Sequence, residues 1–276
     1  MIETLNRMKK IVPFLKWAGG KRWLIPSLNL SKLQNDNKYI EPFLGGGALF
    51  FSLLPKSAIL SDKNSELIET YEVIRNDPFN IMDRLSHHHK FHSVDYFYKI
   101  RENIPNNEID RAARFIYLNR TCWNGLYRVN KRGRFNVPIG TKTNVVLETD
   151  DWEAISDSLK TAIILNRDFE ESIEMATEGD VVFADPPYTV KHNNNGFVKY
   201  NESIFLWQDQ IRLRDCLKRA ADRGATVIVT NAAHDSIVDI YRKDFSINVM
   251  ERASVLSGVS SARGRYQELF ITANYE

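Results

Sequence analysis

The stretch GDVVFADPPY, residues 179–188, is the clearest indication of fold class in this 276-residue chain. Its continuous apolar run is typical of a strand that is buried on both faces of a parallel sheet. The run ends abruptly at Asp185, and the two prolines after it fix the backbone and prevent a helix from starting there. Open α/β sheets bind ligands beyond the carboxyl ends of their strands, so we expect Asp185 to lie at a ligand site.

Similar apolar runs alternate with helical patterns along the chain. The strand-like runs cover residues 39–43, 57–62, 161–169 and 224–233, and the helical patterns cover 64–75, 170–176, 206–223 and 235–241. This alternation predicts a doubly wound α/β sheet. Two further strand-like runs, 245–255 and 265–275, are joined by a Gly/Ser-rich link and should pair as an antiparallel edge.

The interval from about 77 to 150 breaks this rhythm. It contains helical patterns over 80–91, 95–104 and 108–120, followed by a polar, basic stretch. We interpret the interval as an insertion between strands of the sheet. The predicted domains are therefore a first catalytic part at 1–76, an inserted domain at 77–149 and a second catalytic part at 150–276. KHNNNGF, at 191–197, has the composition of a loop.

The composition is that of a soluble globular protein, with 43% hydrophobic and 26% charged residues. Since no apolar run approaches the roughly 18 residues that a membrane helix needs, we expect no membrane segment. The start of the chain carries no small-residue cleavage site, which favours a cytoplasmic location. Cys122 and Cys216 have no metal or redox spacing, and histidines 87–89 and 92 lack accompanying ligands, so we expect no metal.

The net charge of +2 hides an uneven distribution of basic residues. From residue 111 to residue 147 the chain has no Asp or Glu. The basic residues of this segment are Arg111, Arg114, Arg120, Arg128, Lys131, Arg132, Arg134 and Lys142. Such a segment can neutralise phosphates, and it indicates binding to nucleic acid.

A strand, a turn of three glycines and a helical pattern follow one another in YIEPFLGGGALFFSLL, residues 39–54. Gly45, Gly46 and Gly47 allow a ligand to approach the backbone closely. The next strand ends in Asp62, whose carboxylate can accept the two ribose hydroxyls of NAD, FAD or S-adenosylmethionine. Because the turn is not the GxGxxG phosphate cradle, a cofactor without a pyrophosphate fits it better.

A second glycine pair lies upstream in FLKWAGGKRWL, residues 14–24. Trp17 precedes Gly19 and Gly20, and Lys21 follows them. An aromatic ring beside two glycines can hold a nucleobase, although a helix N-terminus with a buried tryptophan gives the same pattern.

The tetrapeptide DPPY, residues 185–188, joins two acceptors and a stacking surface on one rigid turn. The acceptors are the Asp185 carboxylate and the Pro186 carbonyl, and Tyr188 supplies the aromatic face. An exocyclic aromatic amine, such as N6 of adenine, requires such a site. Two acceptors on its N–H bonds favour a more tetrahedral nitrogen, whose lone pair can then reach an activated methyl group.

Six motifs occur in a characteristic order: WAGGK (17–21), EPFLGGGALF (41–50), LSDKN (60–64), LNRTCWNGLYRVNKRGRFNVPIG (118–140), RDF (167–169) and DPPY (185–188). In these motifs the chain resembles the DNA adenine methyltransferase (Dam) family. The resemblance implies a Rossmann-like methyltransferase sheet with an inserted, mainly helical DNA-recognition domain. It also implies S-adenosylmethionine as cofactor, double-stranded DNA as partner, no metal and a monomeric enzyme.

The resemblance further implies which residues form the site. Asp185, Pro186, Pro187 and Tyr188 would be catalytic. The residues that would contact the cofactor are Trp17, Ala18, Gly19, Gly20, Lys21, Phe43, Gly45, Gly47, Asp62, Asp168, Phe169 and Asp185.

The segment 118–140 would contact DNA. Trp123, flanked by small residues, is suited to wedge into the stack that a flipped base leaves, and Arg128 can bond bidentately to a guanine edge. The DNA-contacting residues that we expect are Lys16, Arg120, Trp123, Asn124, Leu126, Arg128, Lys131, Arg132, Arg134 and Pro138. In the family, this segment with Lys16 and Pro138 reads GATC. Two positions depart from the family: Trp123 stands where tyrosine is usual, and Arg134 where an acid is frequent.

Three alternatives remain open at this point. The same two acceptors can grip the N4 amine of cytosine. A DNA-binding protein can hold S-adenosylmethionine as a sensed ligand without transferring its methyl group. An NAD-dependent oxidoreductase is the third alternative, and the missing phosphate cradle argues against it.

Overall fold

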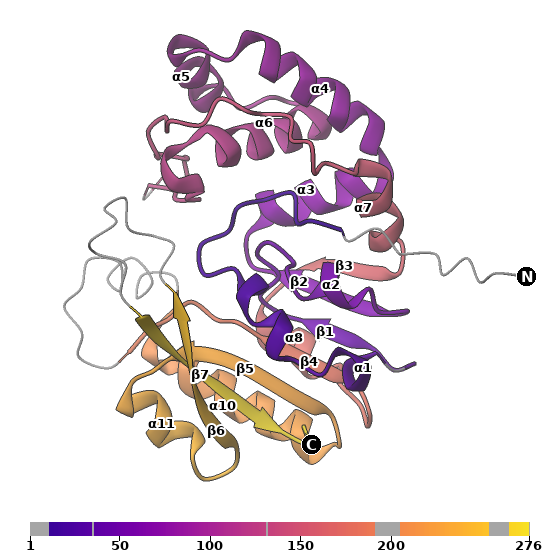
Figure 1. Cartoon of the computed structure of the whole chain (residues 1–276), viewed down its shortest axis with the longest axis vertical. Coiled ribbons are helices and arrows are strands. Elements are labelled where there is room, and N and C mark those ends of the chain that lie inside the picture. The colour runs from indigo at the N-terminus through magenta and orange to yellow at the C-terminus, as the bar shows by residue number, and fades with distance from the viewer. Residues whose placement is uncertain (1–10, 35, 131, 191–204, 254–264, 276) are drawn as a thin grey trace, which may run out of the picture. The chain divides into compact units, whose positions relative to one another are not determined.

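The computed structural model describes residues 11–34, 36–130, 132–190, 205–253 and 265–275 (Figure 1). The loop that we expected at 191–197 and the link between the last two strands lie outside these residues. The chain divides into two compact units. The helical unit comprises Met1–Leu30, Gly45–Leu54 and Glu69–Lys160, and the sheet unit comprises Ser31–Leu44, Pro55–Ile68 and Thr161–Glu276.

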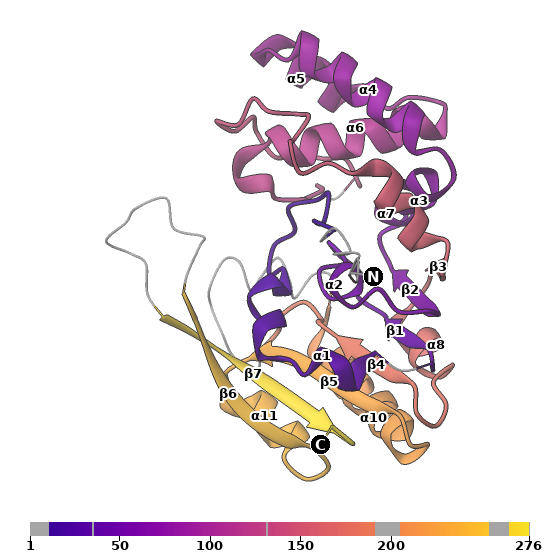
Figure 2. The ribbon, with the colours of Figure 1, turned by 45° about the vertical axis from the view of Figure 1, so that its right-hand side comes forward.

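The sheet unit is built on a mixed sheet. Among the described residues its strands are β1 (Tyr39–Glu41), β2 (Ala58–Asp62), β3 (Ala162–Asn166), β4 (Val181–Ala184), β5 (Thr226–Ala232), β6 (Ser246–Ala253) and β7 (Arg265–Ala273). Their order is β3-β2-β1-β4-β5-β7-β6. The first five strands are parallel, and β7 runs antiparallel to both β5 and β6 (Figure 2). The predicted doubly wound sheet with an antiparallel edge is confirmed.

One register brings the carboxyl ends of the parallel strands to the same edge of the sheet. Tyr39 of β1 is paired with Ala58 of β2 on one side and with Val181 of β4 on the other. Because these three strands start level, they also end close to one another. The residues that follow their last positions, including Asp185, therefore share one edge.

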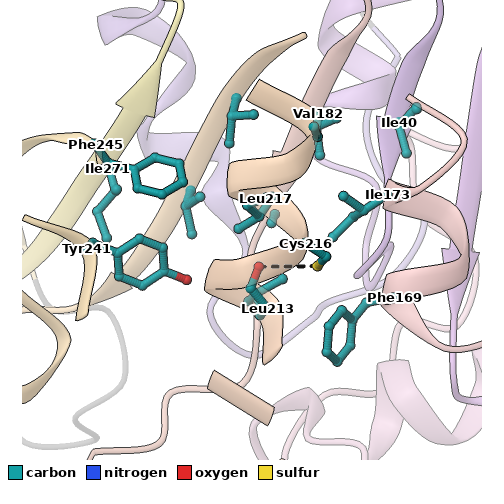
Figure 3. Close-up of a cluster of buried hydrophobic side chains, with 14 of the residues drawn as sticks. Ile40, Phe169, Ile173, Val182, Leu213, Cys216, Leu217, Tyr241, Phe245 and Ile271 are labelled. Carbon is teal, nitrogen blue, oxygen red and sulfur yellow. Dashed lines mark hydrogen bonds between the residues drawn. The ribbon is translucent and has the colours of Figure 1, made fainter. Parts of the chain in front are cut away.

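Three helices cover one face of this sheet. They are α8 (Phe169–Ile173), α10 (Trp207–Asp222) and α11 (Asp235–Tyr241). Figure 3 shows Leu213, Cys216 and Leu217 of α10 among the buried side chains of α8 and the strands. All three are fully buried. The 3.6-residue period of α10 thus turns one apolar stripe toward the sheet, as the sequence pattern predicts.

The helical unit is formed mainly by α-helices. Its elements are η1 (Lys21–Trp23), η2 (Ile25–Ser27), α2 (Phe50–Leu53), α4 (Pro78–Phe91), α5 (Val94–Glu102), α6 (Glu108–Thr121), η3 (Trp123–Gly125) and α7 (Trp152–Leu159). Two further helices, α1 (Leu30–Leu33) and α3 (Ser65–Asn76), contain residues of both units. No helix within the described ranges has the length and apolar character needed to cross a membrane.

Side-chain caps fix where the helices of this unit begin. Asp77, Ser93 and Asn107 accept hydrogen bonds from backbone N–H groups in the first turns of α4, α5 and α6, respectively. A cap satisfies donors that have no partner within the helix, and each one stabilises its helix by about 1 kcal/mol. Pro78 at the first position of α4 needs no N–H partner, which explains why α4 starts two residues before the predicted pattern.

A histidine lies within the packed part of the helical unit. His88 of α4 is 9% exposed, stacks on Tyr117 at 4.7 Å and shares a hydrogen bond of 2.9 Å between its Nδ1 and the Tyr96 hydroxyl. Burial, together with the nearby His87 ring, lowers the pKa of His88 to about 4. The imidazole is therefore neutral in the folded protein at neutral pH, which suits a stacked and hydrogen-bonded ring.

Acid should destabilise the fold through His88. Between pH 6.5 and about 4 the unfolded chain binds a proton that the folded state excludes, so the free energy of unfolding falls as the pH falls. His88→Phe should remove up to roughly 3 kcal/mol of this pH dependence. Urea unfolding at several pH values measures it. His87→Gln, an exposed change on the same helix, should keep most of the dependence, and equal slopes for both variants would contradict the assignment.

Candidate active site and DNA-recognition surface

The DPPY turn begins where β4 ends. Ala184 is the last residue of the strand, and Asp185 follows it. The Thr230 hydroxyl, on the neighbouring strand β5, donates a hydrogen bond of 2.7 Å to Oδ1 of Asp185. Thr230 is 1% exposed, and its β-branched side chain has few accessible rotamers within the sheet. The carboxylate is thus held by a residue of the core.

Tyr188 closes the turn at its other end. Its hydroxyl donates to Oε2 of Glu268 on β7 over 2.7 Å. Burial of the hydroxyl, and the negative charges of Asp185 and Glu268, raise the pKa of Tyr188 well above its ordinary value. The phenol therefore stays protonated and remains a donor to Glu268, while its half-buried ring keeps part of its surface accessible.

Buried polar side chains also hold the residue that follows the turn. The Thr189 hydroxyl donates to the Phe205 carbonyl over 2.7 Å, and the Gln210 amide donates to the Thr189 carbonyl over 3.4 Å. Gln210 accepts in turn from Asn231. Sequence reasoning missed Thr230, Glu268, Gln210 and Asn231. The available signal was the placement of polar residues inside otherwise apolar elements, since such residues are buried only with partners.

Asp62 and the start of the glycine turn are neighbours within the sheet unit. The Leu44 N–H donates to the Ser61 carbonyl over 3.0 Å, so the turn starts beside the last residues of β2. Oδ1 of Asp62 accepts from the Asn64 N–H over 2.9 Å.

Phe43 and Phe169 form a stacked pair in the sheet unit, with centroids 5.4 Å apart and an angle of 26° between the rings. The preceding residue, Asp168, caps α8 and receives two hydrogen bonds from Arg212, of 2.6 and 3.0 Å. Although burial alone would raise it, the pKa of Asp168 is lowered by Arg212 and by the Glu170 N–H. A ligand here meets a carboxylate that is already paired with Arg212, a partner that the sequence did not reveal.

Trp17 and the glycines of the second motif lie in the helical unit. The Trp17 ring stacks on Tyr127, with centroids 5.8 Å apart, and a Cβ added to Gly45 would lie 2.6 Å from Trp17 Cδ1. Gly45 and Gly47 have φ values of +47° and +61°. Both the space and the backbone thus require glycine at position 45.

The remaining residues of WAGGK form a tight turn beside Trp17. The Gly20 N–H donates to the Trp17 carbonyl, and Nζ of the buried Lys21 donates to the Gly19 carbonyl. Gly19 has φ +80°, and Ala18 is exposed. The ammonium group is thus held inside the turn rather than extended into solvent.

Several predicted DNA contacts gather around the short turn η3, although Lys16 is far from it in the sequence. A Cβ added to Gly125 would lie 2.6 Å from Lys16 Cδ, and the Trp123 N–H donates to the Pro138 carbonyl over 2.9 Å. Lys16 and Pro138 are exposed, and the Trp123 side chain is 54% exposed. At this exposure the indole ring is accessible to a binding partner.

Backbone conformation explains why Trp123 is exposed. Asn124 and Gly125 have φ values of +56° and +64°, and such a pair turns the chain sharply. Asparagine and glycine tolerate this left-handed region better than other residues do. Leu126, half-buried, closes the turn with a hydrogen bond from its N–H to the Trp123 carbonyl.

The basic residues after this turn differ in their surroundings. Arg128, Arg132 and Arg134 are exposed, and Arg128 donates to the Asn136 side chain over 2.9 Å. Lys131 lies outside the described residues. These exposed guanidinium groups are available to phosphates or bases.

Arg120 is not exposed, contrary to what a phosphate contact requires. Its guanidinium donates to both carboxylate oxygens of Asp150 over 2.7 Å and to the carbonyls of Phe14 and Val145. Only 4% of its side chain is accessible. Because a buried cation requires such partners, Arg120 has a structural role and lies outside the proposed DNA interface.

Histidines 87–89 and 92 do not form a metal site in the structure. His92 shares a hydrogen bond with the Tyr117 hydroxyl, and His89 accepts from the Val145 N–H. The part of the chain that the structure describes contains no group of three or more His, Cys, Asp or Glu residues that could hold a metal ion.

Comparison with protein families gives a match over most of the chain. The model of the D12 class N6 adenine-specific DNA methyltransferases matches residues 17–255, which include every motif from WAGGK to DPPY. The chain belongs to the D12 class of N6 adenine-specific DNA methyltransferases.

Proteins with similar sequences are named as methyltransferases or DNA adenine methylases. Type II methyltransferase M1.LlaDCHI of Lactococcus lactis subsp. cremoris is 37% identical over 272 residues, which are 95% of each chain. Type II methyltransferase M.MjaIII of Methanocaldococcus jannaschii is 39% identical over 85% of this chain and 88% of its own. DNA adenine methylase of Escherichia coli is 31% identical over 84% of each chain.

Membership of the D12 class confirms the predicted family, enzyme class and DNA substrate. The family methylates adenine at N6, so the N4-cytosine and non-catalytic alternatives are not retained. The reaction of this class, methylation of adenine, requires a methyl donor.

Substitution of Gly45 in this D12-class enzyme should test the packing of Trp17. Gly45→Ala should lower the free energy of unfolding by about 2–4 kcal/mol, because it adds a strained φ and a clash with the indole. In a Trp17→Ala background the same substitution should cost about 1–2 kcal/mol, the strain alone. Gly133→Ala is the control, since Gly133 has φ +72° and an added Cβ there meets no atom of the described residues within 4 Å. Additive effects at positions 45 and 17 would contradict the contact.

Proposed function

We propose that this enzyme transfers a methyl group from S-adenosylmethionine to N6 of an adenine flipped out of double-stranded DNA, within the sequence GATC. The observation that carries the proposal is the double anchoring of the DPPY turn. Thr230 holds Asp185 at one end, and Glu268 holds Tyr188 at the other. A turn that is fixed at both ends can position a reacting amine with little loss of freedom at the moment of reaction.

The chemistry follows from the groups on this turn. The Asp185 carboxylate and the Pro186 carbonyl accept hydrogen bonds from the two N–H groups of adenine N6, and the Tyr188 ring stacks on the base. With its N–H bonds held, the nitrogen directs its lone pair toward the methyl carbon. Transfer would form the N–C bond as the donor's S–C bond breaks; the electron pair of that bond would stay on sulfur, leaving a neutral thioether, and the nitrogen would lose one proton to water. Thr230 fixes the orientation of the accepting carboxylate throughout.

The residues present fit S-adenosylmethionine as the donor. Leu44, the residue before the glycines, bonds the Ser61 carbonyl on β2, and the carboxylate of Asp62 at the end of that strand suits ribose hydroxyls. A cofactor without a pyrophosphate is consistent with a turn that lacks the phosphate cradle. When bound, the cofactor supplies a sulfonium-activated methyl group.

We assign the remaining cofactor contacts by the family resemblance. The Phe43–Phe169 pair offers an aromatic surface, and Trp17 lies against Gly45. The proposed contacts are Trp17, Ala18, Gly19, Gly20, Lys21, Phe43, Gly45, Gly47, Asp62, Asp168, Phe169 and Asp185.

DNA recognition is assigned to the surface around η3. An exposed tryptophan on a left-handed turn is suited to fill the gap that a flipped base leaves. Lys16 lies beside Gly125, and the Pro138 carbonyl accepts a hydrogen bond from the Trp123 N–H. The family resemblance connects both Lys16 and Pro138 with the reading of GATC. The proposed contacts are Lys16, Trp123, Asn124, Leu126, Arg128, Lys131, Arg132, Arg134 and Pro138.

We also propose that residues 77–149 act as an inserted target-recognition domain between catalytic parts at 1–76 and 150–276. The enzyme would work on DNA as a monomer in the cytoplasm. Both statements extend the family resemblance.

Base-resolved mapping of methylation tests the proposed reaction and site. Purified protein is incubated with S-adenosylmethionine and methylation-free plasmid DNA of mixed sequence. N6-methyladenine confined to GATC is the expected result. Methyladenine in another sequence would overturn the assignment of the site-reading residues, and the absence of methylation would overturn the proposal.

Removal of the Thr230 hydroxyl should slow catalysis while the fold is retained. Thr230→Val keeps the shape of the side chain but loses the hydrogen bond to Asp185, so kcat should fall about ten- to a hundredfold. Thr226→Val is the control, because its hydroxyl, on the same strand, donates to the Asn274 carbonyl instead. Steady-state kinetics measure both variants, and equal kcat values would show that the hydrogen bond does not matter for transfer.

A further inference from the structure

A buried asparagine connects the segment of Lys16 with the turn η3. Asn119 lies on the last turn of α6 and is 1% exposed. Its Oδ1 accepts a hydrogen bond of 3.0 Å from the Lys16 N–H, and its Nδ2 donates to the Lys16 carbonyl over 2.8 Å. The same Nδ2 donates to the Gly125 carbonyl over 3.2 Å. One side chain thus binds two segments that are more than a hundred residues apart.

Contacts beside these bonds set the distance between the segments. Gly125 approaches Lys16 so closely that a Cβ would lie 2.6 Å from Lys16 Cδ and 3.0 Å from its Cβ. The neighbouring Arg120 holds the Phe14 carbonyl, two residues before Lys16. The last turn of α6 therefore fixes the backbone of Phe14 and Lys16, and that of Gly125 on the other side of Lys16.

The chemistry of the three hydrogen bonds is specific to an amide. A primary amide offers an acceptor oxygen and two N–H donors on one planar group, and Asn119 uses all of them. Aspartate has the same shape but no donor, and it would bring its charge against two carbonyl oxygens. An aliphatic residue would leave three backbone groups without these partners, including the buried carbonyl of Gly125.

We propose that Asn119 is a positioning residue for target selection. It sets the place of Lys16 relative to Trp123 and, through the peptide bond after Lys16, the start of the Trp17 segment. The inference rests on the proposed function, in which Lys16 and Trp123 contact DNA and Trp17 contacts the cofactor. Asn119 itself lies below this surface and touches neither ligand.

Such a role predicts an effect on selectivity as well as on rate. Two reading groups select a site only if their separation matches the DNA, and a misplacement of about 1 Å costs up to about a hundredfold in rate. A misplaced Lys16 affects the correct site most, because incorrect sites already lack the matching contact. The ratio of kcat/KM for the correct site to that for a site with one changed base pair should therefore fall.

The test compares Asn119→Asp with a matched control, Asn274→Asp. In the sheet unit, Asn274 donates from Nδ2 to the carbonyls of Ala221 and Ala225, so both changes remove an amide donor from two carbonyls. The selectivity ratio is measured on duplexes that carry the site found for the wild-type enzyme and on duplexes with one changed base pair. Thermal unfolding and the KM for S-adenosylmethionine are measured on the same preparations.

Asn119→Asp should lower the selectivity ratio about tenfold or more and raise the KM for S-adenosylmethionine. Asn274→Asp should lower the unfolding temperature but change neither the selectivity ratio nor the KM for S-adenosylmethionine. An unchanged ratio for Asn119→Asp would reduce Asn119 to a structural residue and overturn the inference. A wild-type enzyme that methylates no DNA would overturn the proposed function and this inference with it, and that result is seen before any variant is compared.

A second pair of variants keeps the inference testable if Asn119→Asp does not fold. Gly125→Ala pushes on Lys16 and leaves Asn119 intact, so it should lower the same ratio. Gly224→Ala is its control, since Gly224 also has a positive φ, of +93°, and the three atoms nearest to an added Cβ there all belong to Glu178. Equal ratios for Gly125→Ala and Gly224→Ala would contradict a role for the Lys16 position in target selection.

Discussion

The parallel pairing of β1 with both β2 and β4 determines which residues of the sheet unit can form a site together. Parallel strands that start level, as Tyr39, Ala58 and Val181 do, end at one edge of the sheet. Asp62, at the end of β2, and Asp185, directly after β4, therefore lie at the same edge, although they are far apart in the sequence. The antiparallel strand β7 carries Glu268, which accepts the hydrogen bond of the Tyr188 hydroxyl. A strand outside the parallel part of the sheet thus also holds a residue at this edge.

In both units, buried polar residues on regular elements hold loops that carry proposed site residues. Thr230 on β5 and Glu268 on β7 hold the DPPY turn, and Asn119 on α6 holds Lys16 and Gly125. Burying a polar group is unfavourable unless it is hydrogen-bonded, so these residues are tolerated where their partners are loop groups. Loops position reacting groups accurately only when a rigid scaffold holds them in this way.

The fold was predictable because its strands and helices have clear periods. The runs at 57–62 and 224–233 correspond to β2 and β5 with small differences at their ends. The strand expected at 161–169 ends earlier, at Asn166, because Asp168 caps the helix α8. A cap competes with the strand for the same residues, and periodicity alone does not resolve that competition.

The site was less predictable, because its contacts join distant parts of the chain. Arg120 belongs to a segment without acids, so its sequence neighbours indicate a phosphate contact, whereas Asp150 pairs with it thirty residues later. The position of Lys16 beside Gly125 depends likewise on the fold of the whole helical unit. Motifs identified the residue types and their order, but burial and partners came only from the tertiary structure.

Single-turnover methyl transfer by Asp185→Ala, with DNA binding measured on the same preparation, is the direct test of the proposed role of the DPPY turn. We predict that transfer slows by about a hundredfold or more, since one acceptor of the amine is lost, while affinity for DNA is unchanged. Transfer at a rate near that of the wild-type enzyme would contradict the role of the DPPY turn.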